Sequence, residues 1–322
     1  MYYTIRHVTK FRYSDQISES VMEVRMQPLT DDRQRCLSFE LRTNPKSVIR
    51  GFTDNIQNRV HHFNVPDRHA HLNITAESLV EVNMPSSSLD TPSHGSWDEL
   101  DRLTAHDEYW DLLHPTSRTQ PSDALDILAG EIGAARGTNP FVDILALNKA
   151  VHEAIEYDGQ STDVNSPIDE VLASRRGVCQ DFTHIMIALT RGLGVPARYV
   201  SGYLHHREGE SAQPSAGATH AWVEALFARG GWIGFDPTNN TLAGDRHIRV
   251  AVGRDYTDVP PTRGVFKGKA TTELAVSVRV IPSPGPTLTS VGEDEKEPIY
   301  RITLESTELL EDTFYEQPQQ QQ

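Results

Sequence analysis

Hydrophobic and polar residues alternate with a period of two along much of the first 83 residues, and this alternation predicts β-strands. The segments that carry it are YYTIRHVTKFRY, SVMEVRMQPL, RCLSFELRT and LNITAESLVEVN. Turn-forming residues such as SDQ, TDD and NPKS separate them. Several short strands at this spacing predict an all-β N-terminal domain over residues 1–84, built as a small antiparallel sheet or sandwich.

The pattern changes in the next part of the chain. The stretch PSSSLDTPSHG is typical of a linker, and residues 85–120 are therefore expected to combine a linker with a helical segment. Beyond it, Ser122 is placed to cap one helix, and Pro140 stands near the start of another with apolar residues at helical spacing. After the central region, HIRVAVG and TTELAVSVRVI return to β-type patterns that extend to about residue 282.

Composition and charge narrow the function classes. The chain has 322 residues and a formal net charge of -15, and almost half of that charge lies in residues 291–322. An acidic balance argues against nucleic-acid binding and against docking on an anionic membrane. No apolar run approaches the ~18 residues of a membrane span, and the N-terminus has no signal-peptide pattern, so a cytoplasmic protein is expected. Residues 283–322 are expected to form an acidic, partly disordered tail.

A helix is predicted to begin near Cys179, within SRRGVCQDFTHIMIALTRGLGVP. Gly192 and Gly194 are placed to end it. A cysteine in the first turn of a helix gains stabilisation of its thiolate from the helix dipole. Arg175 and Arg176 add positive charge nearby, with simple solvation of both side chains as the alternative. This position favours a nucleophile, although most free cysteines are small buried apolar residues.

A second constellation lies on a predicted hairpin. THAWVEALF and GWIGFDPTNN read as strands, with ARGG as the turn between them. If the turn centres near Arg229, Asp236 lies opposite Trp222 and therefore on the same face of the sheet as His220. A carboxylate in that position can orient the imidazole toward a thiol, whereas a slip of one residue would separate the two side chains.

Four motifs together resemble the core of the transglutaminase-like superfamily of papain-like cysteine enzymes: GVCQDFTH, GLGVPARYVSGY, THAWVEAL and GWIGFDPTNN. YTIRHVTKFRY and DNIQNRVHHFNV resemble the N-terminal domain of bacterial members. The resemblance implies Cys179 as nucleophile, His220 as base and Asp236 as the residue that orients the base. It also implies an α+β, papain-like core over residues 121–282, in which the cysteine-bearing helix packs on an antiparallel sheet with trailing strands.

The implied reaction is attack of the thiol on an amide or peptide carbonyl, with a thioester intermediate. Water would complete a peptidase or amidase reaction, and an amine would complete a protein-glutamine gamma-glutamyltransferase reaction. Hydrolysis is slightly favoured, because residues 143–171 lack the upstream tryptophan of the cross-linking animal enzymes. A non-catalytic binding or assembly module with the same fold is the alternative from another class. A protein, peptide or amide is the expected partner, and the oligomeric state is left open.

Further candidates surround this core. Tyr157 is a candidate oxyanion donor, although a packed aromatic residue is the commoner interpretation. Trp222, Arg254, Asp255 and Tyr256 are candidates for the substrate cleft, the last three with ion pairing as an equal alternative. The four histidines in HHFNVPDRHAH lack acidic or thiol partners at ligand spacing, so no metal site and no cofactor are predicted.

Overall fold

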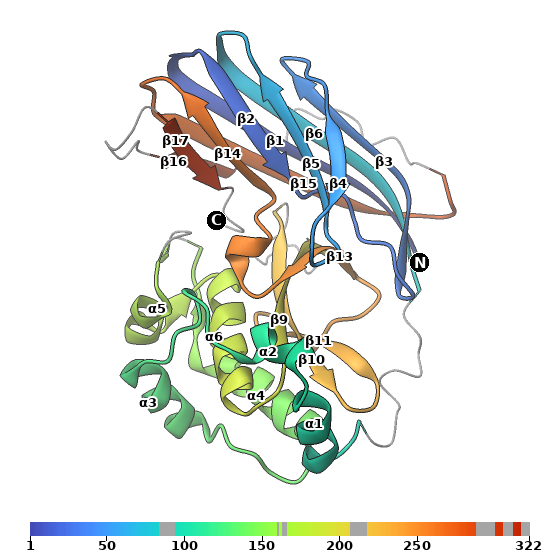
Figure 1. Ribbon diagram of the computed structural model, residues 1–322, viewed down its shortest axis with the longest axis vertical. Coiled ribbons are helices and arrows are strands. Elements are labelled where there is room, and N and C mark those ends of the chain that lie inside the picture. The colour runs from blue at the N-terminus through green and yellow to red at the C-terminus, as the bar shows by residue number, and fades with distance from the viewer. Residues whose placement is uncertain are drawn as a thin grey trace.

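The residues that alternate along the N-terminal strands meet in the core of a β-sandwich in the computed structural model of the chain (Figure 1). Tyr3, Ile5, Phe11 and Tyr13 all enter this core from strand β1 (Tyr2–Ile17), so the predicted period of two holds for this strand. The structure describes residues 1–83, 94–159, 161–162, 166–206 and 218–287, together with the backbone of residues 300–304 and 312–316.

Two five-stranded antiparallel sheets form the sandwich. The first has the order β16-β15-β1-β6-β3 and the second the order β17-β14-β2-β5-β4. The remaining strands of the sandwich are β2 (Glu19–Val24), β3 (Gln34–Asn44), β4 (Arg50–Thr53), β5 (Arg59–Val65), β6 (His69–Val82), β14 (Thr262–Lys267), β15 (Thr272–Ser283), β16 (Tyr300–Leu304) and β17 (Asp312–Glu316).

Strands from the end of the chain complete this sandwich, and this corrects the division made from sequence. The sequence pattern groups all of residues 121–282 with the papain-like core. In the structure β15 pairs with β1 and β14 pairs with β2, so the trailing strands leave the core and join the N-terminal strands. Residues 283–322 also contribute strands, because β16 pairs with β15 and β17 with β14. Alternation identifies a strand but does not select a partner that is distant in sequence.

A third antiparallel sheet forms the centre of the molecule. Its order is β12-β11-β10-β9-β13, and it is referred to below as the central sheet. Its strands are β9 (Ala197–Leu204), β10 (His220–Phe227), β11 (Gly231–Asp236), β12 (Thr241–Leu242) and β13 (His247–Gly253). Every residue of β10 and β13 is buried, which is expected of strands covered on both faces.

Helices cover one face of the central sheet. They are α1 (Trp97–Thr104), α2 (Trp110–Leu113), α3 (Asp123–Ile132), α4 (Pro140–Ala154), α5 (Ile168–Ser174) and α6 (Cys179–Gly192), with the 3-10 turns η2 (Asp107–Tyr109) and η3 (Tyr256–Asp258) and a short parallel pair of strands, β7 (Glu156–Tyr157) and β8 (Arg176–Gly177). Two predicted helix starts hold. The Ser122 side chain accepts from the Leu125 N–H, and Pro140 is the first residue of α4.

Helix α6 is the central element of the helical layer. All its residues from Cys179 to Arg191 are buried, and its apolar side chains pack with those of β10 and β9. The other face of the central sheet meets the sandwich, since Tyr203, Ile248 and Val250 belong to the sandwich core. The molecule is therefore an α+β structure in which a cysteine-bearing helix packs on an antiparallel sheet, next to an all-β region, as the sequence predicts.

A buried ion cluster joins the central sheet to the sandwich. The Glu224 carboxylate lies 3.0 Å from the Arg33 guanidinium, 2.6 Å from that of Arg198 and 3.5 Å from that of Arg249. Burial opposes ionisation of this carboxyl group, but the three arginines outweigh burial and lower the pKa of Glu224 to about 2. Arg249, on β13 of the central sheet, also pairs with Asp31, which precedes β3 of the sandwich. The cluster therefore includes acidic and basic side chains from both parts of the molecule.

A neutral polar contact lies at the same junction. The His7 imidazole on β1 approaches the Tyr203 hydroxyl on β9 at 3.0 Å through Nδ1 and the Thr9 hydroxyl at 3.3 Å through Nε2. His7 is fully buried, and burial lowers its pKa to about 3, so the ring is neutral at pH 7. Burial has the same effect on His184 in α6, whose pKa is also lowered to about 3.

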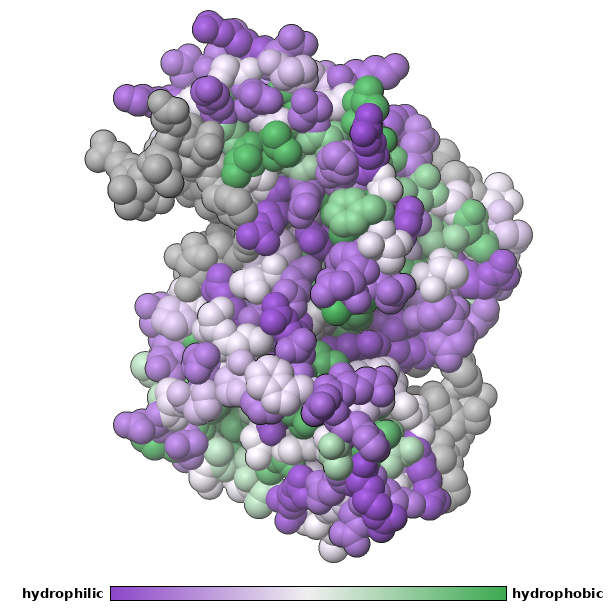
Figure 2. Space-filling view, in the orientation of Figure 1, coloured by the Kyte–Doolittle hydropathy of each residue, from purple (hydrophilic) through white to green (hydrophobic). Residues whose placement is uncertain are grey.

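Exposed apolar side chains are scattered over the surface. Figure 2 shows a mostly hydrophilic face with small, separate hydrophobic groups. The most exposed large apolar residues among those described include Val48, Ile127, Trp110 and Val142, which lie in different parts of the fold. Among the described residues, no helix has the length and apolar character needed to cross a membrane.

The buried neutral histidines predict acid-sensitive folding. An unfolded histidine titrates near pH 6.5 and His7 in the folded protein near 3, so the folded chain binds fewer protons between these values. The stabilisation is complete above about pH 6.5 and is lost as the pH falls toward 3, by up to about 1.4 kcal/mol per pH unit for each such group.

We expect His7→Gln to make the free energy of unfolding, measured with urea between pH 7 and 4, fall less steeply with decreasing pH than in the native sequence. His71→Gln, at an exposed position of β6, is the matched control and is expected to leave the slope unchanged. Parallel curves for the native chain and His7→Gln would contradict the assignment.

Candidate active site

Cys179 is the first residue of α6, as the sequence predicts. The chain reaches it through Gly177, where an added Cβ would lie 2.9 Å from Asp181 Oδ2 and 3.0 Å from Val171 Cγ1. The Asp181 side chain occupies this space. Its Oδ2 accepts from the Val178 N–H at 2.8 Å and from the Thr162 hydroxyl at 2.7 Å. The aspartate thereby satisfies an N–H at the start of its own helix and fixes where the helix begins.

The β10–β11 hairpin has the predicted register. Val223 lies opposite Phe235 and Phe227 opposite Gly231, so the next pair along the ladder is Trp222 and Asp236. His220 begins β10 and Asp236 ends β11. The register therefore brings the two side chains together at one end of the central sheet, with His220 Nε2 2.7 Å from Asp236 Oδ2.

This contact determines the tautomer of His220. Both residues are buried, and an ionised carboxylate can only accept hydrogen bonds. Nε2 therefore carries the hydrogen that is donated to Asp236. In the neutral ring the lone pair is then on Nδ1, which is the nitrogen that can accept a proton.

Asp236 has two further partners that the sequence analysis did not identify. The Asn239 side-chain amide donates to Oδ2 at 2.7 Å and its backbone N–H to Oδ1 at 3.2 Å. His247, the first residue of β13, lies with Nε2 3.2 Å from Oδ2. Asn239 follows Asp236 closely enough for an Asx-type turn to be expected, but nothing in the sequence around His247 signals this contact.

These donors determine the charge of Asp236. Burial alone would raise the pKa of this carboxyl group. The His220 and His247 side chains outweigh burial and hold the pKa of Asp236 well below its usual range. The carboxylate is therefore ionised at the pH values at which proteins are stable.

The thiol of Cys179 differs from the prediction in its acidity. The helix start leads us to expect a lowered pKa, but the side chain is fully buried, and burial raises the pKa of the Cys179 thiol well above its ordinary value. Hydrogen bonds from the Ala221 and Gln180 backbones lower it, while the Asp236 and Asp181 charges raise it further. Desolvation of the buried thiol therefore outweighs the helix dipole.

The expected positive charge near the thiol is also compensated. The Arg175 guanidinium pairs with Glu131 at 2.6 Å. The Arg176 guanidinium lies 3.2 Å from Asp158 and 3.6 Å from Glu156. Each arginine is thus neutralised by carboxylates of neighbouring elements.

Strand pairing brings Tyr157 near the start of the cysteine-bearing helix. It lies in β7, which runs parallel to β8, and it pairs with Gly177, two residues before Cys179. Its half-buried ring packs against the core of the helical layer. This position fits the packed aromatic residue that the sequence leaves as an alternative to an oxyanion donor.

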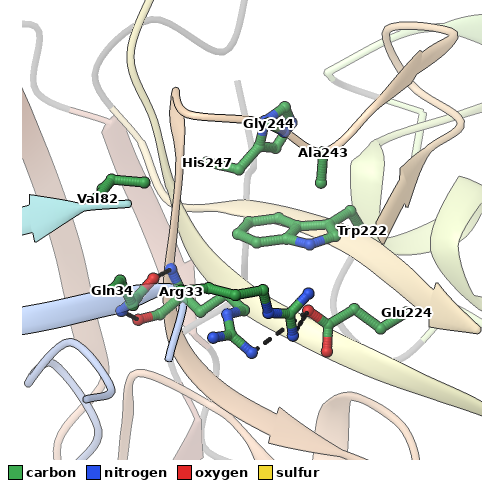
Figure 3. A pocket seen from close by; sticks show the side chains of 9 residues that line it. Arg33, Gln34, Val82, Trp222, Glu224, Ala243, Gly244 and His247 are labelled. Carbon is green, nitrogen blue, oxygen red and sulfur yellow. Dashed lines mark hydrogen bonds and ion pairs between the residues drawn. The ribbon is translucent and has the colours of Figure 1, made fainter. Parts of the chain in front are cut away.

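Trp222 is buried behind the His220–Asp236 pair. Its ring centroid lies 6.0 Å from that of His220 and 5.2 Å from that of His247. The indole lines a small hollow of about 20 Å³, whose other lining residues include Arg33 and Glu224 (Figure 3). The structure therefore puts Trp222 under the site and not at an open cleft.

The other cleft candidates take part in local structural contacts. The Arg254 guanidinium forms two hydrogen bonds with the Asp258 carboxylate, at 2.9 and 3.0 Å, which is the ion-pair alternative. Asp255 is buried and accepts from the Thr257 N–H at the start of η3. Tyr256 is buried and its backbone N–H donates to His184 Nε2.

One group of side chains has the geometry to hold a metal ion, within the part of the chain that the structure describes. His220, Asp236 and His247 offer ligand atoms that lie within 4.8 Å of one another. The donor set does not favour an ion, because Asp236 Oδ2 is already the acceptor for three N–H groups at 2.7, 2.7 and 3.2 Å. A hydrogen-bond network accounts for this group.

Comparison with known proteins identifies relatives that match most of the chain. The family model of the transglutaminase-like superfamily matches residues 128–237, and the model of the bacterial transglutaminase-like N-terminal region matches residues 3–81. An uncharacterized protein of Mycobacterium leprae (strain TN) is 32% identical over 275 residues, which are 85% of this chain and 96% of that protein.

Two further comparisons concern proteins whose names state an activity. A protein-glutamine gamma-glutamyltransferase of Pseudomonas aeruginosa is 28% identical over 120 residues, which are 34% of this chain and 17% of that protein. The crystal structure of a candidate cysteine protease from Cytophaga hutchinsonii superposes with a TM-score of 0.69 over 98% of both chains at 20% identity. This likeness shows a common fold.

The packing under the site predicts that Gly202 cannot be replaced. Gly202 lies opposite His220 in the β9–β10 ladder, and an added Cβ would collide with the Ile248 carbonyl oxygen and lie 2.5 Å from the Trp222 ring. We expect Gly202→Ala to reduce the free energy of unfolding by about 2–4 kcal/mol, measured by urea titration.

The matched control is Gly192→Ala, because no atom lies within 4 Å of an added Cβ at this helical position. It is expected to leave stability unchanged or slightly increased. Equal effects of the two substitutions would show that the close packing beneath His220 is not rigid.

The raised thiol pKa predicts slow alkylation of the folded protein. Iodoacetamide reacts with thiolate, so the rate at Cys179 should be below that of an unfolded thiol at pH 7 and should increase as the pH is raised. Mass spectrometry of labelled peptides, with a urea-unfolded sample as reference, measures both rates. Faster labelling of Cys179 in the folded protein than in the unfolded sample at pH 7 would contradict the raised pKa and support the lowered pKa expected from sequence.

Proposed function

Because the chain belongs to the transglutaminase-like superfamily, we propose that it is a cysteine enzyme that acts on amide or peptide bonds through Cys179, His220 and Asp236. The observation that carries the proposal is the buried 2.7 Å contact between His220 and Asp236, at the strand end where the Ala221 backbone also contacts the Cys179 sulfur. A nucleophile, a base and a group that orients the base are the parts that covalent acyl transfer requires.

The first half of the reaction forms a thioester. As the Cys179 sulfur attacks the substrate carbonyl carbon, His220 Nδ1 accepts the thiol proton, and the negative charge moves to the carbonyl oxygen. The Asp236 carboxylate stabilises the imidazolium that results. The carbonyl then re-forms, the carbon–nitrogen bond breaks, and His220 returns its proton to the leaving amine.

The oxyanion of the intermediate needs hydrogen-bond donors. The first backbone N–H groups of a helix have no partner within the helix, and Cys179 is the first residue of α6. We therefore assign oxyanion stabilisation to the backbone N–H of Cys179 itself, at the start of α6. Tyr157, two residues from the cysteine across the β7–β8 pair, is the side-chain alternative.

The raised thiol pKa bears on the order of these events. The buried thiol is neutral, so the proposal requires proton transfer to His220 during the attack and not a stored thiolate. A base held in one tautomer by an ionised partner is suited to this role. Substrate entry also requires Cys179 to become accessible.

The fate of the thioester distinguishes two activities. We favour hydrolysis by water, that is, peptidase or amidase activity, since the upstream tryptophan of cross-linking enzymes is absent from residues 143–171. Transfer to an amine is the second candidate, and the similarity to the Pseudomonas aeruginosa gamma-glutamyltransferase over a third of the chain favours it.

The test uses two probes, a blocked glutaminylglycine dipeptide and casein, each with and without an added alkylamine. We expect ammonia or new peptide termini to be released, and we expect Cys179→Ser and His220→Ala to reduce the rate about 1,000-fold or more. Cys36→Ser, a half-buried thiol on β3, is the matched control and should retain activity.

The products decide between the candidates. Incorporation of the alkylamine would replace hydrolysis by transfer as the activity. Product formation that persists in Cys179→Ser would contradict the assignment of Cys179 as nucleophile. Inert behaviour together with stable binding of the probes would instead favour the non-catalytic binding module.

A further inference from the structure

Asp236 has more hydrogen-bond partners than the orientation of His220 requires, and one of them is a second histidine. We propose that His247 is a positioning residue of the active site, which donates its Nε2–H to Asp236 and holds this carboxylate ionised and directed at His220. The inference rests on the proposed function, in which Asp236 orients the base. It adds a residue from β13, a strand outside the hairpin that carries the other two.

The tautomer of His247 follows from its two neighbours. The Gly244 backbone N–H lies 3.1 Å from Nδ1 and can only donate, so Nδ1 is the acceptor. The hydrogen of the neutral ring is therefore on Nε2. This nitrogen lies 3.2 Å from Asp236 Oδ2, which can only accept. A single tautomer thus satisfies both contacts.

Asp236 needs these donors because it has no access to water. The residue is fully buried, and a buried carboxyl group without sufficient donors takes up a proton. A protonated carboxyl group would itself carry a hydrogen and could not accept fully from His220 Nε2. Each N–H directed at Oδ1 or Oδ2 therefore helps to keep the form that orients the base.

A neutral donor has an advantage at this position. The charged and titratable groups that act on the His247 ring are Asp236 on β11, His220 on β10 and the neighbouring Arg246. Arg33, Glu224 and Arg249 line the same hollow as His247. Burial is the largest of the effects that lower the pKa of His247, so the ring is neutral at pH 7. It donates to Asp236 without cancelling the negative charge that His220 requires when it becomes an imidazolium. A lysine or arginine there would form a competing ion pair.

Packing holds the ring in this orientation. His247 begins β13 opposite Leu204 of β9, and its ring meets the Trp222 indole at 76°. Figure 3 shows His247 above the face of Trp222, at the margin of the hollow described above. Gly202 leaves the space that the indole occupies, since an added Cβ there would lie 2.5 Å from the ring, and the indole in turn packs against both histidines.

The test compares His247→Gln with His247→Leu in the full chain. The amide nitrogen of glutamine reaches about as far as imidazole Nε2 and can donate to Asp236, whereas leucine has similar bulk and no donor. His69→Leu, which removes a buried imidazole in the sandwich, is the matched control for the loss of a buried ring.

Two measurements that need no substrate give the result. Nitrogen-15 NMR of labelled histidines reports the tautomer of His247 and the hydrogen-bonded Nε2–H of His220. The alkylation rate of Cys179 by iodoacetamide at pH 8 reports the assistance that His220 gives to the thiol. We expect His247→Leu to shift the His220 signal and to slow alkylation about 10-fold or more, and His247→Gln to restore both to within about twofold.

Several outcomes would overturn the proposal. They are a hydrogen on Nδ1 of His247, a protonated His247 at pH 7, equal effects of glutamine and leucine, or a loss in His69→Leu as large as in His247→Leu. If His247→Leu does not fold, the tautomer in the native chain and the behaviour of His247→Gln decide. A native His247–Asp236–His220 network in a protein that turns over no amide would leave this inference standing and refute the proposed function.

Discussion

The buried carboxylate of Asp236 is the group on which the geometry of the site depends. A charge without solvent is stable only where several donors converge on it, and here they come from three separate parts of the chain. The hairpin must have one register for His220 to reach it, the turn after β11 must present Asn239, and β13 must begin at His247. Each of these elements is held in place by the rest of the fold. If any of them moved, the buried carboxylate would lose a donor and the folded state would lose stability.

The Glu224 carboxylate is also buried, ionised and surrounded by several donors, but it lies at the junction with the sandwich and not at the site. It lies on the same strand as His220, four residues along, and its arginines come from the segment before β3, from β9 and from β13. The central sheet therefore carries one ionised buried carboxylate at the site and another at the junction with the sandwich. The Glu224 cluster holds the central sheet against the sandwich. Strand β10 is therefore held by buried polar contacts at His220 and again at Glu224.

Local features of this fold could be read from the sequence, and long-range ones could not. The start of α6 and the register of the β10–β11 hairpin depend on neighbouring residues, such as Gly177 and the ARGG turn, and both were predictable. The transfer of β14 and β15 to the sandwich was not, because alternation in TTELAVSVRVI is the same whichever strand it pairs with. His247 was missed because its role depends on a contact across two strands. The thiol acidity of Cys179 was misjudged because burial is a property of the folded chain and outweighs the local helix effect.

The completion of the sandwich by β14 and β15 has a consequence for the order in which the chain acquires its structure. During synthesis, β1 and β2 emerge first, but each lacks one neighbour until residues 262–283 have been made. The helices and the central sheet lie between these two segments and have all their strand partners earlier. The nascent chain can therefore assemble the thiol-bearing helix and its sheet while β1 and β2 each still have an unpaired edge. β15 and β14 then pair with these edges next to a unit that is already built.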